Sequence, residues 1–425
     1  MLGFVKSLFA TKPGPIGIDL GTDTLRLAQC INDGKEWQLI AAACTDVPSG
    51  VRTSAESLNQ FVVEALRELM HQGKFKGREA ILCVPSTDLI IQHIRMPKLD
   101  DSETKKTLPW ELKGKLPIDP NGAVLRHLIA GEVQVNNEPK NEVVVMATPR
   151  STVSNLLQIS AKAKIEVIGM NVEPKAVVDC FGHVYRRKTD ADVVSCFIDI
   201  GCKSTRVTIA RGGLIVFARA IPIGGDTFSQ AVADAMHISF EQAKLLRIKL
   251  ASTPIARPQP FITRPEPVAA EEPPSENHSF ALLGLAPRQD RRHVVEPVAI
   301  VPPSLPDDQA DQLRLVDAAY ANLITHLCDE LNLCRRYYEA TFAQHPVDRI
   351  IFIGGESRQR TMCQGIAQTL GLAAQLGDPM VRMGKTTEVG PESGIDPKQP
   401  QPAWAVALGL SMGPVAAEQP LAKSA

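Results

Sequence analysis

Short apolar runs separated by polar turn residues fill the first part of the chain. The runs GIDL, LRLAQC and WQLIAAAC, between Ile16 and Cys44, predict three strands joined as an antiparallel meander. From Ser54 the apolar positions recur at helical spacing as far as Gly73, which predicts an amphipathic helix. The run AILCVP then predicts one more strand.

The same order of elements begins again further along the chain. The runs VVSCFIDIG, STRVTIAR and LIVFARAI predict a second meander, followed by helices from Asp226 and from Ser239. The first turn of each meander carries an Asp-x-Gly signal, at Asp19 and at Asp199. An internal duplication is the simplest explanation, and it predicts an α/β protein built from two similar halves.

A block of different character lies between the two meanders. The strand LIIQHIRMP, a helix over 100–115, the break LPIDP, and the strands VLRHLIAGEV and EVVVMATP around the turn NNEPKN predict a small inserted α+β subdomain. A helix over 152–163, the strand EVIGMNV and a helix from Pro174 then resume the main pattern, since proline suits a first helical turn.

A proline-rich stretch interrupts the second half. Residues 251–306 combine many prolines with Ala, Glu, Ser and Arg, which is typical of a disordered or polyproline segment. Its less polar islands, FALLGLAP and VVEPVAIVPP, are either docking motifs or weakly packed loops. An amphipathic helix over 307–343, the strand RIIFIGG, a helix over 358–370 and a helix over 403–410 follow.

These patterns divide the chain into successive segments. We expect the first half to begin in 1–83, the inserted subdomain to fill 84–150, and the first half with its connecting helix to return in 151–190. The second half is expected in 191–250 and 307–413, on either side of the proline-rich insert 251–306 and ahead of a flexible tail, 414–425.

Composition narrows the class of function. The formal charge of -1 over 425 residues leaves no basic surplus to hold a polyphosphate backbone, so we expect no nucleic-acid partner. The nine cysteines are scattered without metal-ligand spacing, as in the reduced thiols of a cytosolic protein. No apolar stretch approaches the roughly 20 residues that span a bilayer, so we expect no transmembrane segment.

Both Asp-x-Gly turns are candidate phosphate-binding hairpins. The backbone N–H groups and hydroxyls of such a turn suit phosphate oxygens, while a strand-borne carboxylate suits a water of a bound Mg²⁺ ion. A single hairpin of this kind is more often a plain turn. Two hairpins facing each other would clamp a triphosphate, which favours the functional interpretation for two sets of residues: Asp19, Gly21, Thr22, Asp23 and Thr24, and Asp199, Gly201, Cys202, Lys203 and Ser204.

Two further signals suit the nucleoside end of the same ligand. Gly354, Gly355 and Glu356 follow a strand, where glycine permits close approach of a base or sugar to the backbone. Glu241 and Lys244 are three apart and share a helix face; an exposed ion pair is the plain alternative.

The order of these signals resembles the actin, DnaK-type chaperone and sugar-kinase superfamily. The resemblance implies a duplicated actin-like (ribonuclease H-like) ATPase fold with ATP and Mg²⁺ as cofactors. It implies catalytic roles for Asp19, Glu173 and Asp199, with water-mediated metal binding by the two aspartates, and it adds Gly225 to the nucleotide-binding residues. Glu173 would lie near the attacking water, although a helix start explains it equally well.

The inserted subdomain indicates which branch of this superfamily the chain resembles. VPSTDLIIQHIRMPKLDDSETKKTLPWELKGKLPIDPNGAVLRHLI and, later, RAIPIGGDTFSQAVADAMHISFEQAK are similar to the PilM family of type IV pilus assembly proteins. The resemblance implies a cytoplasmic adaptor, peripheral to the inner membrane, that binds ATP in an interdomain cleft and the tail of a PilN-like single-pass membrane protein. Weak ATPase activity is the most it implies, and the insert 251–306 is a candidate site for other pilus platform proteins.

Two other functions stay open at this point. An FtsA-like cell-division protein shares the position of the inserted subdomain, yet the tail GPVAAEQPLAKSA lacks the amphipathic stripe of that family. A small-molecule kinase of the same superfamily would need a catalytic carboxylate in a substrate pocket.

The first hairpin also departs from the PilM pattern. Asp23 stands where relatives carry a small hydroxylic residue, and Arg26 takes the place of a lysine. A carboxylate beside a triphosphate is repulsive, and Lys203 of the opposing hairpin is its expected counter-charge.

Overall fold

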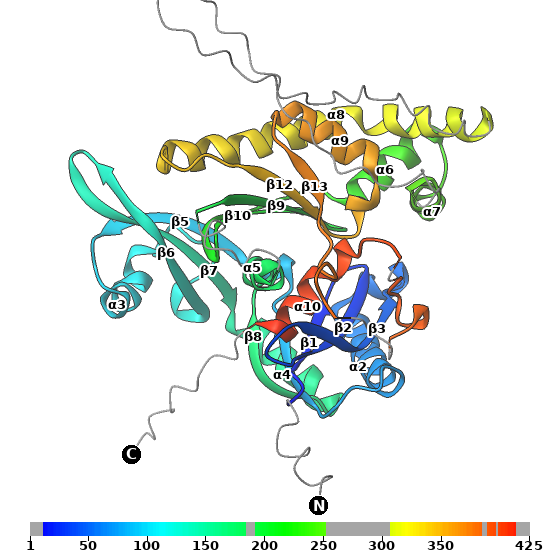
Figure 1. Ribbon diagram of the computed structural model, residues 1–425, viewed down its shortest axis with the longest axis horizontal. Coiled ribbons are helices and arrows are strands. Elements are labelled where there is room, and N and C mark those ends of the chain that lie inside the picture. Colours follow the sequence, from blue (N-terminus) through cyan, green and yellow to red (C-terminus); the bar gives the residue numbers. More distant parts are fainter. Residues whose placement is uncertain (1–11, 184–191, 252–306, 385–388, 397, 414–425) are drawn as a thin grey trace, which may run out of the picture.

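The computed structural model describes residues 12–183, 192–251, 307–384, 389–396 and 398–413 (Figure 1). The predicted insert, apart from Ala251, and the whole predicted tail lie outside these residues. None of the helices in the described ranges is long and apolar enough to cross a bilayer.

The first half is built on a five-stranded sheet in the order β3-β2-β1-β4-β8. β1 pairs antiparallel with β2 and parallel with β4, so the meander is extended by a parallel strand. Ser54 caps α2, as its side chain accepts a hydrogen bond from the Ser57 amide. The elements of this half are β1 (Ile16–Leu20), β2 (Thr24–Asn32), β3 (Trp37–Asp46), η1 (Ser49–Thr53), α2 (Ala55–Gln72), β4 (Glu79–Cys83), η2 (Ser86–Asp88), α4 (Arg150–Lys162) and β8 (Glu166–Asn171).

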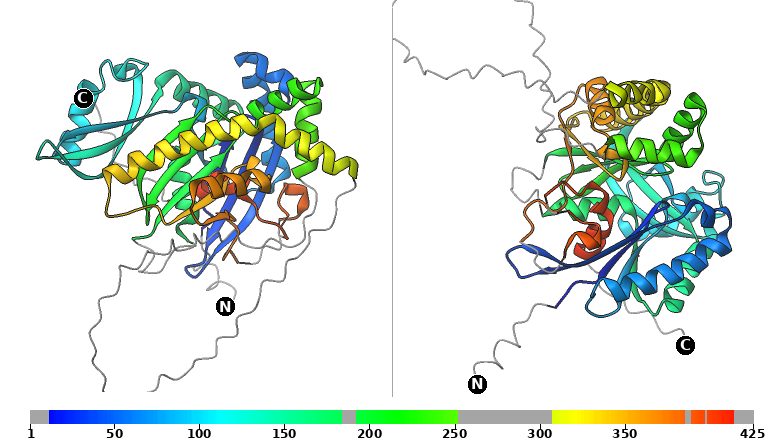
Figure 2. Two further views of the ribbon diagram at one scale, coloured as in Figure 1. Left: turned by 90° about the horizontal axis from the view of Figure 1, so that it is seen from above. Right: turned by 90° about the vertical axis from the view of Figure 1, so that its right-hand side faces the viewer.

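The second half repeats this topology in a sheet ordered β11-β10-β9-β12-β13. β9 again pairs antiparallel with the next strand of its meander and parallel with a later strand, β12. The long helix α8 lies on the side of this sheet that faces away from the first half (Figures 1 and 2). The elements are β9 (Val194–Ile200), β10 (Thr205–Arg211), β11 (Leu214–Ile221), α6 (Gly225–Met236), α7 (Phe240–Ala251), α8 (Asp307–Thr341), β12 (Arg349–Ile353), η5 (Glu356–Arg358), α9 (Arg360–Leu370), β13 (Ala374–Leu376) and η6 (Pro391–Ser393).

Two helices pack between the sheets and bring the halves together: α5 (Glu173–Gly182) and α10 (Ala405–Met412), which follows η7 (Pro402–Trp404) (Figure 1). A Cβ at Gly409 of α10 would lie 1.8 Å from the carbonyl oxygen of Ala176, and one at Gly17 of β1 would lie 2.0 Å from that of Ala407. Only glycine permits these approaches. The duplicated sheets and their central helices form an actin-like fold, as expected.

The inserted subdomain is a three-stranded sheet ordered β5-β7-β6 with α3 against it. Asp100 and Glu103 form a capping box at the start of α3. The predicted turn NNEPKN was too long. β6 and β7 are joined by Asn136 and Asn137 alone, both at positive φ as in a type I′ turn, and Glu138 already lies in the strand. The elements are β5 (Ile90–Pro97), α3 (Asp101–Glu111), η3 (Pro120–Gly122), β6 (Ala123–Val135) and β7 (Glu138–Pro149).

Candidate nucleotide site

A cleft opens between the two halves, and both predicted hairpins line it. Most of the predicted residues meet there: Asp19, Gly21, Thr22, Asp23, Thr24, Glu173, Asp199, Gly201, Cys202, Lys203, Gly354, Gly355 and Glu356.

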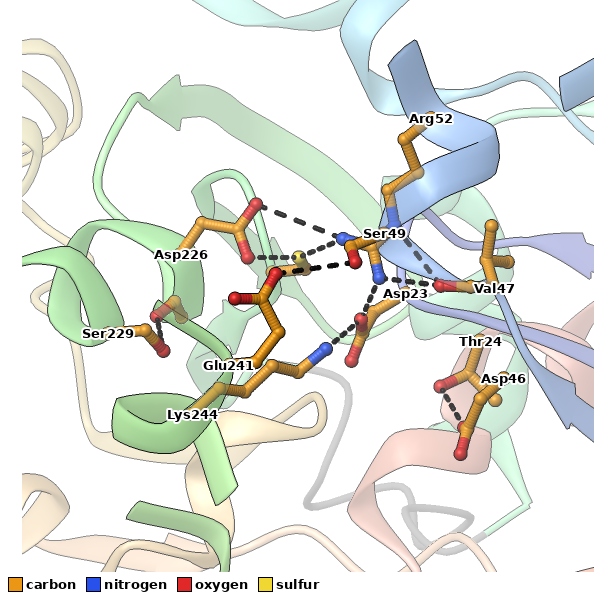
Figure 3. Close-up of polar contacts among 12 residues, drawn as sticks. Asp23, Thr24, Asp46, Val47, Ser49, Arg52, Asp226, Ser229, Glu241 and Lys244 are labelled. Carbon is orange, nitrogen blue, oxygen red and sulfur yellow. Dashed lines mark hydrogen bonds and ion pairs between the residues drawn. The ribbon is translucent and has the colours of Figure 1, made fainter. Parts of the chain in front are cut away.

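Four predicted residues lie around the cleft without lining it: Ser204, Gly225, Glu241 and Lys244. Ser204 and Gly225 support the second hairpin from behind. The Gly201 amide donates to the Ser204 carbonyl at 3.0 Å, and the Gly225 amide donates to the Gly201 carbonyl at 2.9 Å. The start of α6 therefore holds the second hairpin in place. Glu241 and Lys244 lie on α7, and their side chains point toward Ser49 and Asp23 of the first half (Figure 3).

Three carboxyl groups gather in the cleft: those of Asp199 and of Glu173, the first residue of α5, are buried, and that of Asp19 is half-buried. Burial raises the pKa of Asp19 to about 6, against the opposing influence of Arg26 and Arg206. Burial and the neighbouring aspartates also hold the pKa of Glu173 well above its ordinary range, although Arg206 opposes them.

Sequence reasoning missed Arg206, the cation among these carboxylates. Its guanidinium contacts Glu173 through Nε and approaches Oδ1 of Asp199 to 3.4 Å through Nη2. Burial alone would lower the pKa of Arg206, but Glu173, Asp199 and Asp19 raise it, so the side chain is a permanent cation.

A signal for Arg206 was present in the sequence. The stretches DLGTDTLR, ending at Arg26, and DIGCKSTR, ending at Arg206, share the spacing from aspartate to arginine. The strand registers are equivalent too, because Asp19 lies opposite Arg26 and Asp199 lies opposite Arg206. The duplication that predicted two hairpins therefore also pairs each aspartate with an arginine on the next strand.

The expectation that Lys203 balances Asp23 was wrong. Lys203 Nζ lies 2.8 Å from Oδ2 of Asp226, on its own half. Asp23 instead contacts Arg52 of η1 and Lys244 of α7 (Figure 3). Arg52 was not singled out in the sequence, because it lies in a short 3-10 turn without a motif.

The same contacts join the two halves across the mouth of the cleft. Lys244 reaches from the second half to Asp23, and Arg52 approaches Oδ2 of Asp226 to 3.9 Å in the opposite direction. Ser49 also donates a hydrogen bond to Oε1 of Glu241 at 3.4 Å. Glu241 and Lys244 thus both contact the first half, rather than forming the plain exposed pair (Figure 3).

The glycines after β12 approach the second hairpin closely. Gly354 has a φ of +89°, and a Cβ there would lie 2.2 Å from Oδ1 of Asp199. Glu356 is held by the buried Arg247, a second residue that the sequence analysis missed, which also donates to Oγ of Ser229 at 2.8 Å. The loop after β12 is therefore tied to α6 and α7.

The chemistry of the lining fits a nucleotide. Arg26, Lys203 and Arg206 supply cationic donors beside two hairpins that carry hydroxyl groups. A Cβ added at Gly355 would meet nothing within 4 Å, so this glycine borders open space. For Mg²⁺ the fit is poorer, since the guanidinium of Arg206 already engages Glu173 and Asp199. In the described part of the chain, no group of three or more His, Cys, Asp or Glu residues is arranged as a direct metal site.

Comparison with known proteins places the chain in a family. The model of "Type IV pilus assembly protein PilM" matches residues 17–254, which is more than half of the chain, and the model of "Cell division protein FtsA" matches 196–409. The cell division protein FtsA of Bacillus subtilis is 22% identical over 202 residues, covering 48% of this chain. That match covers 39% of the relative, so the chain spans about two fifths of the length of this curated protein.

A solved structure shares the fold along nearly the whole chain. The "PilM-PilN type IV pilus biogenesis complex" is similar at a TM-score of 0.66 and 19% identity, over 94% of this chain and 98% of that one.

Proposed function

The chain belongs to the PilM family of type IV pilus assembly proteins, in the branch that also contains FtsA, and we propose that it is a nucleotide-dependent adaptor of a pilus or related secretion platform. In this proposal ATP binds between the two halves, and a groove beside the inserted subdomain holds the tail of a PilN-like membrane protein. The adaptor is then cytoplasmic and reaches the inner membrane through this partner.

The observation that carries the nucleotide proposal is the pair of hairpins on opposite walls of one cleft. Thr22 and Thr24 belong to one wall, and Lys203 to the other. Phosphate groups between them would meet hydroxyls, backbone donors and cations from both sides. ATP would thereby favour a closed arrangement of the halves, and it can act on a partner only through such a difference between states.

The partner proposal is supported by the family and by the fold. A solved relative is described as a complex with PilN, and its fold extends over 94% of this chain, which includes the inserted subdomain. An extended tail can be held by apolar anchors and backbone pairing in a small interface. The insert 251–306 is proposed as a contact for other platform proteins. An FtsA-like role remains the second candidate, because the FtsA model matches residues 196–409.

A glycine substitution tests the nucleotide proposal without disturbing the fold. Gly355→Phe would place a ring in the open space of the cleft, since its Cβ meets no neighbour. Titration with a fluorescent ATP analogue should show saturable binding to the wild type and at least a roughly tenfold loss in this variant.

The matched control is Gly365→Phe on α9, where a Cβ also meets nothing within 4 Å but which lies outside the cleft. It should bind the analogue as the wild type does. Equal binding by the Gly355 variant, or none by the wild type, would remove the nucleotide proposal.

A further inference from the structure

Arg206 lies among the carboxyl groups to which the resemblance to actin-like ATPases assigns a water-mediated metal ion, those of Asp19 and Asp199. Its guanidinium contacts Glu173 through Nε, and its Nη2 lies 3.4 Å from Oδ1 of Asp199. A positive charge therefore already stands among the carboxylates.

The guanidinium also reaches the phosphate side of the cleft. A Cβ added at Gly201, in the second hairpin, would lie only 2.8 Å from Nη2 of Arg206. Its other terminal nitrogen, Nη1, donates to Oγ of Ser86 at 2.9 Å and to Oγ of Ser204 at 3.4 Å. The guanidinium of Arg206 therefore contacts four side chains and lies against the second hairpin, so its position is fixed before any ligand binds.

We propose that Arg206 takes the place of the magnesium ion, so that nucleotide binds in this cleft without a divalent cation. The inference rests on the proposed function, and it departs from the Mg²⁺ that the resemblance implies. A guanidinium can donate an N–H to a phosphate oxygen, whereas a metal ion binds such an oxygen by direct ligation. A second cation among the same three carboxylates would be repelled by Arg206 at short range.

The first test compares nucleotide binding with and without metal. The wild-type protein is titrated with fluorescent ADP and ATP analogues in buffer containing either MgCl₂ or EDTA. The two dissociation constants should agree within about threefold. Binding that weakens by about tenfold or more in EDTA overturns the inference while leaving the proposed function intact.

The second test needs no nucleotide. Wild-type protein is titrated with Mn²⁺ and the free ion is followed by electron paramagnetic resonance. We expect no saturable site at the cleft, whereas Arg206→Gln should gain one held through water molecules, because the carboxyl groups of Glu173 and Asp199 then lack their cation. A wild-type Mn²⁺ site that Asp199→Asn removes would contradict the inference directly, even if the glutamine variant did not fold.

The control removes the equivalent charge from the other hairpin. Arg26→Gln leaves the contacts of Arg206 with Glu173 and Asp199 in place, so it should gain no Mn²⁺ site. If the wild type binds no nucleotide but Arg206→Gln gains the metal site, the proposal of nucleotide binding is refuted. The claim that Arg206 occupies the place of a metal ion then still stands. If neither occurs, both fail.

Discussion

The carboxylate of Asp23 bears on how strongly the proposed site would bind nucleotide. Its carboxylate is bound by Arg52 from the first half and Lys244 from the second (Figure 3). Phosphate oxygens would compete with Asp23 for the same two cations, because charge-assisted hydrogen bonds are stronger than those between neutral groups. Asp23 therefore neutralises cations at the mouth of the cleft and draws the two halves together.

Replacing Asp23 tests this competition. Asp23→Ser should bind the fluorescent ATP analogue more tightly than the wild type by roughly tenfold, since Arg52 and Lys244 become available to phosphate. The matched control is Asp46→Ser, which removes a carboxylate of the same meander that accepts a hydrogen bond from Oγ1 of Thr24 at 3.3 Å. An unchanged or weaker affinity in the Asp23 variant would show that Arg52 and Lys244 do not bind phosphate and only join the two halves.

The sequence predicted the carboxylate residues of the candidate site better than the cationic residues that contact them. The Asp-x-Gly turns are local signals, because a hairpin and its carboxylate lie within a few residues of one another. The contacts of Asp23 depend on Arg52 and on Lys244, which the fold brings from distant parts of the chain. Arg206 is the exception, since its spacing from Asp199 repeats that of Arg26 from Asp19.

Among the elements, the contact of the inserted subdomain with the second half bears on function. Glu142 of β7 is buried and accepts a hydrogen bond from Oη of Tyr337 in α8 at 2.7 Å. Its other oxygen accepts from Nε of Arg95 at 3.0 Å, and Nδ1 of His93 lies 3.4 Å from the carboxylate. The His93 ring also stacks on Phe217 of β11. Although the subdomain is inserted in the first half, these contacts join it to the second.

Neutralising Glu142 should weaken this connection. Burial alone would raise the pKa of Glu142, but His93, Tyr337 and Arg95 hold it below its ordinary value. A lowered pKa means that this contribution to the free energy of unfolding is present above about pH 4.5 and is lost as pH falls below it. We expect Glu142→Gln to destabilise the protein by roughly 3 kcal/mol at pH 7, measured by urea unfolding.

The difference between wild type and this variant should shrink as pH is lowered from about 5 to 3. Glu138→Gln, on the same strand but with an exposed side chain 3.8 Å from Lys140, is the control and should change stability by less than about 1 kcal/mol. A difference that is constant with pH would show that the charge of Glu142 does not matter to the contact.

Element boundaries were predicted well where a cap or a helical period marks them. α2 begins after Ser54 and α8 begins at Asp307, as expected. The β6–β7 hairpin was misjudged because Glu138, Pro139 and Lys140 are polar and suggested a loop. In the structure they form the outer part of the β6–β7 hairpin with exposed or half-buried side chains, where no apolar pattern is required.

At the scale of the whole molecule, the duplication was predictable and the packing between the halves was not. The repeated hairpins identify two equivalent sheets. The approach of α10 to α5 depends on Gly409, whose Cβ would lie 1.8 Å from the Ala176 carbonyl oxygen. A glycine inside a helix gives no indication of the distant backbone that it will meet.

The arrangement of the two halves predicts how nucleotide and partner affect each other. The subdomain contacts the second half through Glu142, and the halves face each other across the candidate nucleotide cleft. A change of cleft closure must therefore reposition the subdomain or break its contacts with α8. Any groove between the subdomain and the first half would then differ between the nucleotide-bound and nucleotide-free states.

We expect the full chain to bind a labelled peptide from the cytoplasmic tail of a PilN-like protein, with an affinity that changes by roughly five- to tenfold when ATP is added. Fluorescence anisotropy measures both affinities. Glu142→Gln should still bind ATP and peptide, but with a smaller ratio between the two affinities, because the subdomain is less firmly tied to α8. Glu138→Gln should keep the wild-type ratio. Peptide affinity that is indifferent to ATP in the wild type would refute the coupling, and a chain that binds no tail would refute the adaptor itself.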